Sequence, residues 1–594
     1  MSSAKYLTAP DPSERGWPKG VKYIIGNEGC ERFSYYGMRS VLQVHLTALA
    51  VAQTHGAKLE SEQHAQEMFH LFLAGVYAFP IIGAVLADRL LGKYRTILWL
   101  SLVYCLGHLV LSVGENTMTG MWLGLGLIAI GSGGIKPCVS SHVGDQFGKS
   151  NWHLVERVFQ AFYFIINFGS FFSTLLIPWI HAWERKHLNW SIDIGGHEFT
   201  TSIAFGLPGV LMLIATILFW MGRHVFVHVP ASPGGRLGVL DTLSSSLLFT
   251  GFVLLPMFFM DIMSGPAFWG AVVVAAACGI ILFSYRQTLA QDDGFLAVMV
   301  YSIKAAFNGE NARARANVSA DLPAGSIHRN RLFAAAAERF DTITAEGSRA
   351  VLRIISVFFL VSVFWSLFDQ HGSSWVRQAS QMNLQVGVLE LEPGQISAVN
   401  PLMVMLLIPL NNFLLFPLMN RTLFRVTPLR KMTIGMFMAS LAFVVVALLQ
   451  RSIDVAAVNE EKVSVLWQFL PYLVMTQAEV MVSITGLEFA YTQAPRKMKS
   501  TIMGFWLLSV ALGNKIVEFA TKTELPDALS WMESGWQSLR AALEYLFVRF
   551  SGTAASGDGQ SLEQFFWFFA GLMAVAAILF GVRATFYRYQ DYTQ

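Results

Sequence analysis

Long apolar segments recur through this chain of 594 residues, and they restrict its fold more than any other feature. A helix needs about 20 mostly apolar residues to cross a bilayer core. Only 14% of the residues are charged, against about 25% in soluble domains. The sequence therefore predicts an all-α membrane protein. We expect fourteen transmembrane helices, at residues 20–50, 67–91, 95–114, 118–141, 155–181, 201–226, 238–263, 267–290, 350–379, 394–420, 430–450, 464–492, 499–521 and 561–587.

The composition argues against several other classes of protein. The net charge of +3 is too small to indicate a nucleic-acid partner. The four cysteines show no metal-ligand spacing, so we predict neither a metal site nor a disulfide framework. Catalytic triads and nucleotide-binding loops are not indicated either. We therefore expect a protein that is not an enzyme and needs no cofactor. The sequence does not set the oligomeric state, and our default expectation is a monomer among membrane lipids.

Lysine and arginine concentrate in alternate short loops, which sets the expected orientation. One such loop holds Arg89, Lys93 and Arg95, whereas the opposite loop from Gly114 to Gly120 holds no basic residue. Basic loops stay on the cytoplasmic side of a membrane, so we predict both termini in the cytoplasm. The start of the chain lacks the apolar stretch of a signal peptide, and we expect the first helix to remain in the membrane.

The expected helices follow a pattern of six, two and six. Two six-helix halves with a substrate site between them are typical of the major facilitator superfamily. We predict an N-terminal six-helix bundle over residues 1–230 and a C-terminal one over residues 349–594. Residues 231–348 would form two inserted transmembrane helices and a cytoplasmic linker, and residues 522–560 a periplasmic insertion. The inserted helices hold few ionisable residues, so we interpret them as a lipid-facing hairpin without transport chemistry.

The first helix carries the densest set of charges. Glu28, Glu31, Arg32, Tyr35 and Arg39 recur at spacings of three and four and so fall on one helical stripe. A charge at a helix centre costs about 2.5–3.5 kcal/mol on insertion scales, and such groups mark functional sites by default. A carboxylate beside an arginine can exchange a proton for an ion pair. The stripe therefore predicts a water-filled cavity and a proton carrier.

Polar residues on other helices are further candidates. His70 and Tyr77 are seven positions apart and share one helix face. Lys136 follows small residues that allow close helix packing, and we expect it to face the cavity. Asp369 and Glu479 are carboxylates in apolar segments. The remaining candidates are Asn167, Trp365, Asn400, Ser483 and Trp506.

Several long motifs, in a fixed order, resemble those of the proton-coupled oligopeptide transporters (the POT or PTR family), a branch of the major facilitator superfamily. The resemblance covers nearly the whole chain, and the inserted helix pair is similar to that of bacterial members. The matching strings are Glu28-x-x-Glu31-Arg32-Phe33 with Tyr35-Tyr36-Gly37, Gly131-Ser-Gly-Gly-Ile-Lys-Pro-Cys-Val, Phe162-Tyr-Phe-Ile-Ile-Asn-Phe-Gly-Ser, Phe364-Trp-Ser-Leu-Phe-Asp-Gln and Gly486-Leu-Glu-Phe-Ala-Tyr-Thr-Gln-Ala-Pro.

The resemblance implies a symporter that imports di- and tripeptides with protons across a bacterial cytoplasmic membrane by alternating access. It assigns proton coupling to Glu28, Glu31, Arg32 and Asp369, and places His70 near the periplasmic gate. Arg39 would pair with Asp369 and engage the peptide carboxylate. The implied substrate-binding residues are Arg39, Tyr35, Tyr36, Tyr77, Lys136, Asn167, Trp365, Asn400, Glu479, Ser483 and Trp506.

Three other functions stay open at this point. A transporter of the same family could carry another solute, such as nitrate or a drug, although nitrate has no amine to engage Glu479. A drug/proton antiporter of the same superfamily would share the loop around Asp88 but not the charged string of the first helix. A membrane receptor without flux would have no need of buried carboxylates on several helices.

Overall fold

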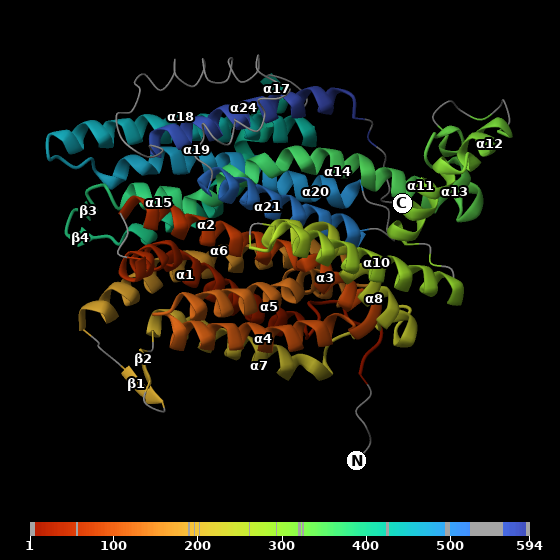
Figure 1. The fold of residues 1–594 in the computed structure, drawn as a ribbon, viewed down its shortest axis with the longest axis horizontal. Coiled ribbons are helices and arrows are strands. Elements are labelled where there is room, and N and C mark those ends of the chain that lie inside the picture. Colours follow the sequence, from red (N-terminus) through yellow and green to blue (C-terminus); the bar gives the residue numbers. More distant parts are fainter. Residues whose placement is uncertain are drawn as a thin grey trace.

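The computed structural model shows long helices that run side by side (Figure 1). The predicted insertion at 522–560 lies outside the described part of the chain, apart from its first residue. The structure describes residues 6–54, 58–187, 191–194, 197–200, 202–260, 262–290, 292, 294–318, 322, 326–422, 427–493, 499–522, 562–587 and 589.

The residues before 230 form six long helical spans. They are α1 (Val21–Thr54), α2 (Lys58–Ala78) continued by α3 (Pro80–Leu86) and the π-helical turn η1 (Ala87–Leu91), α4 (Lys93–Gly114), α5 (Met118–Asp145), α6 (Val155–His187) and α7 (Ile203–Met221). An antiparallel hairpin joins α6 to α7, formed by β1 (Ser191–Ile194) and β2 (His197–Thr200).

Local sequence explains several helix ends. The Thr117 side chain accepts a hydrogen bond from the backbone N–H of Gly120 and begins α5, and Ser202 does the same for α7 with Phe205. Such caps satisfy backbone donors that lack a helical partner. Gly92 has a φ of +79°, which glycine adopts without steric cost, and it separates η1 from α4.

The residues after 340 form the second set of long spans. They are α14 (Thr342–Phe368) with η6 (Asp369–Gly372) and α15 (Ser374–Ala379), then η7 (Pro393–Ala398) with α16 (Val399–Leu410) and α17 (Phe416–Thr422), α18 (Pro428–Val458), α19 (Phe469–Glu479) with η10 (Val480–Ile484) and α20 (Thr485–Thr492), α21 (Lys499–Lys522) and α24 (Leu562–Thr585). A two-residue hairpin, β3 (Gln385–Val386) and β4 (Leu389–Glu390), follows α15.

Between the two sets lie two further spans and a linker. The spans are α8 (Gly235–Phe249) with α9 (Leu255–Phe258), and α10 (Gly265–Leu289). The linker holds α11 (Phe295–Phe307), α12 (Glu310–Ala316) and α13 (Ala334–Arg339).

Thirteen helices of the described chain are long and apolar enough to cross a membrane. Thirteen of the fourteen predicted segments correspond to them. The other segment, 20–50, corresponds to α1, which is absent from the thirteen. α1 is nonetheless 34 residues long and packs along α6 and α7. Its charged stripe sets it apart from the other spans in composition.

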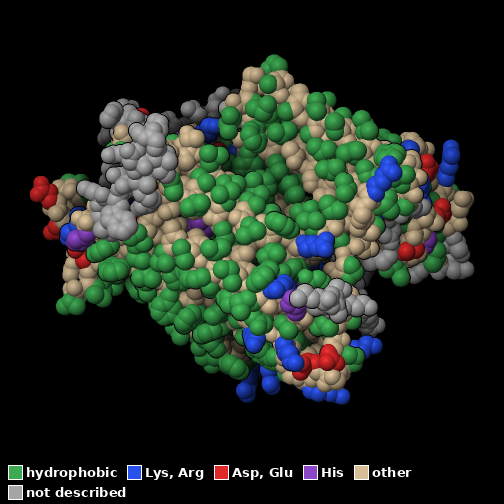
Figure 2. All heavy atoms as spheres, turned by 90° about the horizontal axis from the view of Figure 1, so that it is seen from below, with side chains coloured by type: hydrophobic (Ala, Val, Ile, Leu, Met, Phe, Trp, Pro, Cys, Tyr) green, Lys and Arg blue, Asp and Glu red, His purple; other side chains and the backbone are tan. Residues whose placement is uncertain are grey.

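The buried apolar side chains form two main clusters, one for each set of long spans. The first runs from Val21 to Phe226, and the second from Val351 to Phe580. We call the helices around them the N-terminal bundle and the C-terminal bundle. Outward-facing side chains are also apolar, and Figure 2 shows hydrophobic side chains over much of one lateral face. Large exposed hydrophobic residues are expected where a surface meets lipid.

The two ends of the bundles differ. We call the end with the β1–β2 and β3–β4 hairpins the hairpin end, and the end with α11, α12 and α13 the linker end (Figure 1). Lys93 at the start of α4 lies at the linker end, and Glu115 follows the other end of that helix. On the face drawn in Figure 2, lysine and arginine gather mainly toward the linker end.

The inserted pair, α8 to α10, carries a buried charge network. The Arg286 guanidinium lies 2.6 Å from an Asp241 carboxylate oxygen, and both side chains are at least 90% buried. Arg89 of η1 lies 3.6 Å from Asp241 and 3.4 Å from Asp292. Gly238 packs so tightly on η1 that a Cβ would lie 2.0 Å from the Arg89 carbonyl oxygen. The pair therefore docks onto the N-terminal bundle through charge as well as apolar contact.

The linker has a small core of its own. Val298, Ile327 and Phe333 are buried together with Ala345, which belongs to the first turn of α14. Because α11 and α13 both contact α14, the linker forms one packed unit with the start of the C-terminal bundle.

Candidate functional site

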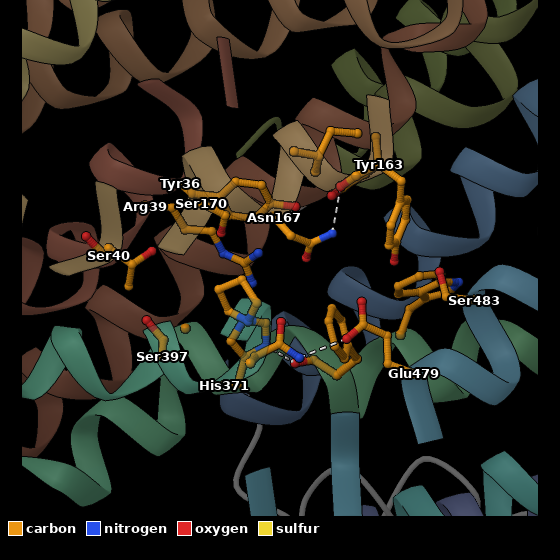
Figure 3. Close-up of a pocket in the computed structure, with 18 residues that line it drawn as sticks. Tyr36, Arg39, Ser40, Tyr163, Asn167, Ser170, His371, Ser397, Glu479 and Ser483 are labelled. Carbon is orange, nitrogen blue, oxygen red and sulfur yellow. Dashed lines mark hydrogen bonds between the residues drawn. The ribbon is translucent and has the colours of Figure 1, made fainter. Parts of the chain in front are cut away.

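A cavity of about 200 Å³ lies between the two bundles (Figure 3). Both bundles contribute to its wall, and most of the lining side chains are polar or aromatic. The lining residues are Tyr36, Arg39, Ser40, Tyr77, Tyr163, Ile166, Asn167, Ser170 and Thr174 from the N-terminal bundle, and Trp365, Phe368, His371, Gly372, Ser397, Asn400, Pro401, Glu479 and Ser483 from the C-terminal bundle.

The cavity carries opposite charges on opposite sides. In Figure 3, Arg39 and Ser40 lie on one side, whereas Glu479 and Ser483 lie on the other. The Asn400 side-chain amide donates to Glu479 Oε2 at 2.8 Å and to Thr476 Oγ1 at 3.1 Å. This clamp fixes the direction of the Glu479 carboxylate.

Arg39 joins the two bundles on the hairpin side of the cavity. Its Nη2 donates to Asp369 Oδ1 at 2.9 Å and to the Asp369 carbonyl oxygen at 3.2 Å. The guanidinium also lies over the Phe69 ring, 5.5 Å from its centroid. Charge-assisted hydrogen bonds of this kind are strong in a dry interior, so the pair holds α1 against η6.

The ion pair continues into a buried chain of hydrogen bonds. The Asn514 side-chain amide donates to Asp369 Oδ2 at 2.7 Å. The Asn514 oxygen therefore accepts from His70 Nδ1, at 2.8 Å. In a neutral His70 ring, Nε2 then accepts from the Ser373 hydroxyl at 2.7 Å. All four side chains are buried, and the chain crosses twice between the bundles.

A second ion pair links the bundles further toward the hairpin end. Arg377 of α15 lies 2.5 Å from Glu62 of α2. Nearby, the Gln66 amide donates to the Thr521 hydroxyl at 3.1 Å. The sequence reasoning missed both contacts, because neither pair is linked by helical spacing.

Three residues of the charged stripe of α1, Glu28, Glu31 and Arg32, form a cluster and are not among the residues that line the cavity. Arg32 Nε lies 2.7 Å from Glu28 and 3.2 Å from Glu31. Both carboxylates are almost fully buried. The pairing of Glu28 with Arg32 across one helical turn agrees with the i,i+4 spacing in the sequence.

Tyr35 and Lys136, both predicted to bind substrate, are not among the residues that line this cavity. The Lys136 ammonium lies over the rings of Tyr35 and Tyr77, 4.2 and 4.6 Å from their centroids. Tyr35 is fully buried beside Tyr36. Successive helical residues point about 100° apart, so only Tyr36 reaches the cavity.

Trp506 also lies one layer behind the wall. Its ring packs edge-on against Trp365, with centroids 5.8 Å apart, and against Phe358 at 5.1 Å. Trp506 therefore supports Trp365, which does line the cavity. The other predicted binding residues in the lining are Tyr36, Arg39, Tyr77, Asn167, Trp365, Asn400, Glu479 and Ser483.

Several lining residues were not predicted. Tyr163, Ser170 and Thr174 share a face of α6 with Asn167, at spacings of −4, +3 and +7. Helical periodicity from Asn167 would have found them. His371 lies two positions after Asp369 in η6, where the turn departs from the α-helical period that the prediction assumed.

The described residues include no group of three or more His, Cys, Asp or Glu side chains that could hold a metal ion. The four cysteines are free thiols.

Comparisons with known proteins agree on one family. A family model described as "PTR2: POT family" matches residues 94–532. The chain is 31% identical to solute carrier family 15 member 2 of Homo sapiens over 81% of this chain and 55% of that protein. It is 33% identical to peptide transporter family 1 of Drosophila melanogaster over 74% of this chain and 49% of that protein. The chain thus spans about half the length of these relatives.

Solved structures match over nearly the full length. The POT family transporter PepTSo, solved in meso, gives a TM-score of 0.69 at 36% identity and covers 96% of this chain and 98% of its own. A structure described as an auto-inhibited POT family peptide transporter gives 0.71 at 34% identity, covering 97% and 99%. These matches confirm the predicted all-α membrane fold of the major facilitator type.

Proposed function

Because the chain belongs to the POT family, we propose that it imports di- and tripeptides together with protons by alternating access to its central cavity. Its relatives are named as transporters, not enzymes. The observation that carries the proposal is a cavity between two bundles with Arg39 on one side and Glu479 on the other.

A short peptide is complementary to these two poles. Its carboxylate would meet Arg39, whose Nη2 is committed to Asp369 while the rest of the fork can grip a carboxylate. Its ammonium would meet Glu479, which Asn400 holds in place. The rings of Tyr36, Tyr77 and Trp365 would contact the side chains of the peptide through their apolar surface. Asn167 and Ser483 would offer hydrogen bonds, and Tyr35, Lys136 and Trp506 would support the wall from behind.

Protons would act on the contacts that hold the bundles together. Protonation of Asp369 would remove the charge that holds Arg39 and so weaken closure at the hairpin end. Glu28, Glu31 and Arg32 would form a second protonation site, nearer the linker end. His70, in the same buried chain as Asp369, would act at the gate. Ligand binding and proton binding would then be coupled, because both shift the balance between the closed and the open form of the Arg39–Asp369 contact.

Orientation and domain division complete the proposal. The linker end, rich in lysine and arginine, would face the cytoplasm, as would both termini, in a bacterial inner membrane. The bundles would comprise residues 1–230 and 349–594, with the inserted pair and linker between them. The protein would act as a monomer, with the proton as coupling ion and no cofactor.

The test is uptake of labelled dialanine into proteoliposomes under an inside-negative potential and an inward proton gradient. Accumulation that a protonophore abolishes would support the proposal, and Glu28→Gln should abolish it too. No uptake by correctly folded protein would overturn it in favour of a non-peptide solute.

The two poles are tested by competition with blocked peptides. N-acetyl-dialanine lacks the ammonium and should compete about tenfold or more weakly than dialanine, because hydrogen bonds to charged groups contribute about 1.5–3 kcal/mol. Glu479→Gln should shrink that ratio. Ser397→Ala is the matched control, since Ser397 lines the cavity but its hydroxyl already bonds to the Gly394 carbonyl oxygen.

A further inference from the structure

His371 is the one imidazole among the lining residues of the cavity. Its Nδ1 lies 2.5 Å from the Phe368 carbonyl oxygen. A carbonyl oxygen only accepts hydrogen bonds, so Nδ1 carries the hydrogen. In the neutral ring the other nitrogen, Nε2, is therefore a bare acceptor.

The ring is held firmly in this orientation. It packs against Phe368, with centroids 4.8 Å apart, and lies 6.4 Å from the Tyr472 ring. The Tyr472 hydroxyl also donates to the His371 carbonyl oxygen at 3.2 Å. Within the part of the chain that the structure describes, no side chain donates to Nε2. A fixed acceptor on the wall of a binding cavity is thus available to a ligand.

His371 stands next to the cationic pole. A Cβ on the following residue, Gly372, would lie 3.1 Å from Arg39 Nε, so the guanidinium packs directly on this backbone. In Figure 3, His371 and Arg39 lie on one side of the cavity and Glu479 on the other. Arg39 is paired with Asp369 and can only donate hydrogen bonds. Nε2 of the neutral His371 ring is therefore an acceptor beside the place where a carboxylate would bind.

A peptide held by its carboxylate has one donor at this place. The amide nitrogen of the C-terminal residue is two bonds from the carboxylate carbon, and its N–H is a strong donor that must be satisfied when water is excluded. The ammonium is already assigned to Glu479, at the far side. The Nε2 acceptor near Arg39 therefore matches the last peptide N–H and nothing else in a dialanine backbone.

We propose that His371 determines specificity by accepting the last peptide N–H of the substrate through Nε2. This rests on the proposed function, since it assumes that the carboxylate binds Arg39. The residue would select ligands with an amide at this position over esters of the same shape. With an ester, an oxygen lone pair would face the Nε2 lone pair and leave both unsatisfied.

The test compares dialanine with alanyl-lactate, in which an ester oxygen replaces the amide N–H. Both compete against labelled dialanine in proteoliposomes, and the readout is the ratio of their inhibition constants. Wild type should prefer dialanine about tenfold or more. His371→Leu should bring the ratio close to one, whereas His371→Gln, which keeps an acceptor oxygen, should retain a clear preference. His371→Phe, which keeps a ring without an acceptor, should match the leucine variant and replaces it if that variant fails to fold.

Either of two results would overturn the inference while leaving peptide transport intact: a wild-type ratio near one, or a high ratio that the leucine and phenylalanine variants preserve. Failure of dialanine uptake itself would instead count against the proposed function. Ser397→Ala, on the same side of the cavity in Figure 3, serves as control and should leave the ratio unchanged.

Discussion

Two buried ion-pair networks in this protein are alike in charge and in depth but join different parts of the molecule. Arg39 and Asp369 connect the N-terminal bundle to the C-terminal bundle at 2.9 Å. Arg286 and Asp241 connect the two inserted helices at 2.6 Å, and Arg89 ties them to the N-terminal bundle. All four side chains of the two pairs are at least 90% buried.

The difference shows that burial of charge alone does not identify transport chemistry. A buried pair is costly wherever it lies. In an alternating-access transporter, only a pair between the moving bundles must break during the cycle. The Arg286–Asp241 pair lies within one insertion and can stay closed throughout. The elements that a pair connects therefore decide whether it can couple a proton to movement.

Breaking the Arg286–Asp241 ion pair should give the largest of the expected effects. The property that it changes is the stability of the fold. Asp241→Asn leaves Arg286 buried without its counterion. Removing one partner of a buried pair typically costs about 3–5 kcal/mol. We expect a marked fall in the free energy of unfolding, measured by denaturant or thermal unfolding in detergent, with dialanine accumulation per folded molecule close to wild type.

The apolar double variant Asp241→Leu with Arg286→Met should recover much of that stability, since a well-packed apolar pair can replace an ion pair. Loss of proton-driven accumulation in folded Asp241→Asn protein would contradict the distinction between the two networks.

Breaking the Arg39–Asp369 pair between the bundles should weaken the coupling of dialanine uptake to the proton gradient. Each proton that enters at 100 mV brings about 2.3 kcal/mol, enough for roughly fifty-fold accumulation of a neutral solute. Asp369→Asn removes the titratable group, so we expect accumulation to fall toward equilibrium while counterflow exchange of dialanine continues. The control is Asp241→Asn in the same vesicles. Full concentrative uptake by Asp369→Asn would show that the proton acts elsewhere.

The Glu62–Arg377 pair should give the smallest effect and sharpen the comparison. It joins the bundles but does not line the cavity, and its side chains, 11% and 9% exposed, are nearly as buried as those of the other two pairs. In the Glu62→Gln variant, Arg39 and Asp369 still hold the bundles together. The population open at the hairpin end should therefore rise only modestly, while accumulation stays intact.

The check is the labelling rate of a cysteine at Gln63, in a background without the four native cysteines, by a maleimide that does not cross membranes. An unchanged rate would mean that this pair does not hold the bundles together.

Features that depend on the local spacing of residues could be predicted from the sequence. The pairing of Glu28 with Arg32 follows from one helical turn, and the long spans follow from apolar length. The resemblance to a family supplied the pairing of Arg39 with Asp369. Contacts such as His70 with Asn514, 444 positions apart, depend on how the bundles meet, which no local pattern encodes.

Other features have no signal in the local sequence. The inserted helices were interpreted as a lipid-facing hairpin without transport chemistry because they hold few ionisable residues, and no local spacing indicated that Arg286 and Asp241 pair between them. Neighbouring residues of one motif were also treated alike. The structure separates Tyr36, on the cavity wall, from Tyr35, behind it, because a helix presents only one of two successive side chains to a given face.

The small core shared by the linker and α14 determines what a spectroscopic label on the linker would report. A label at Phe307, 88% exposed at the end of α11, sits on a unit packed against the C-terminal bundle. Its distance to a second label on α4 would therefore track rotation of one bundle against the other. Pulsed electron-spin measurements between these sites could follow the transport cycle without placing any probe in the central cavity.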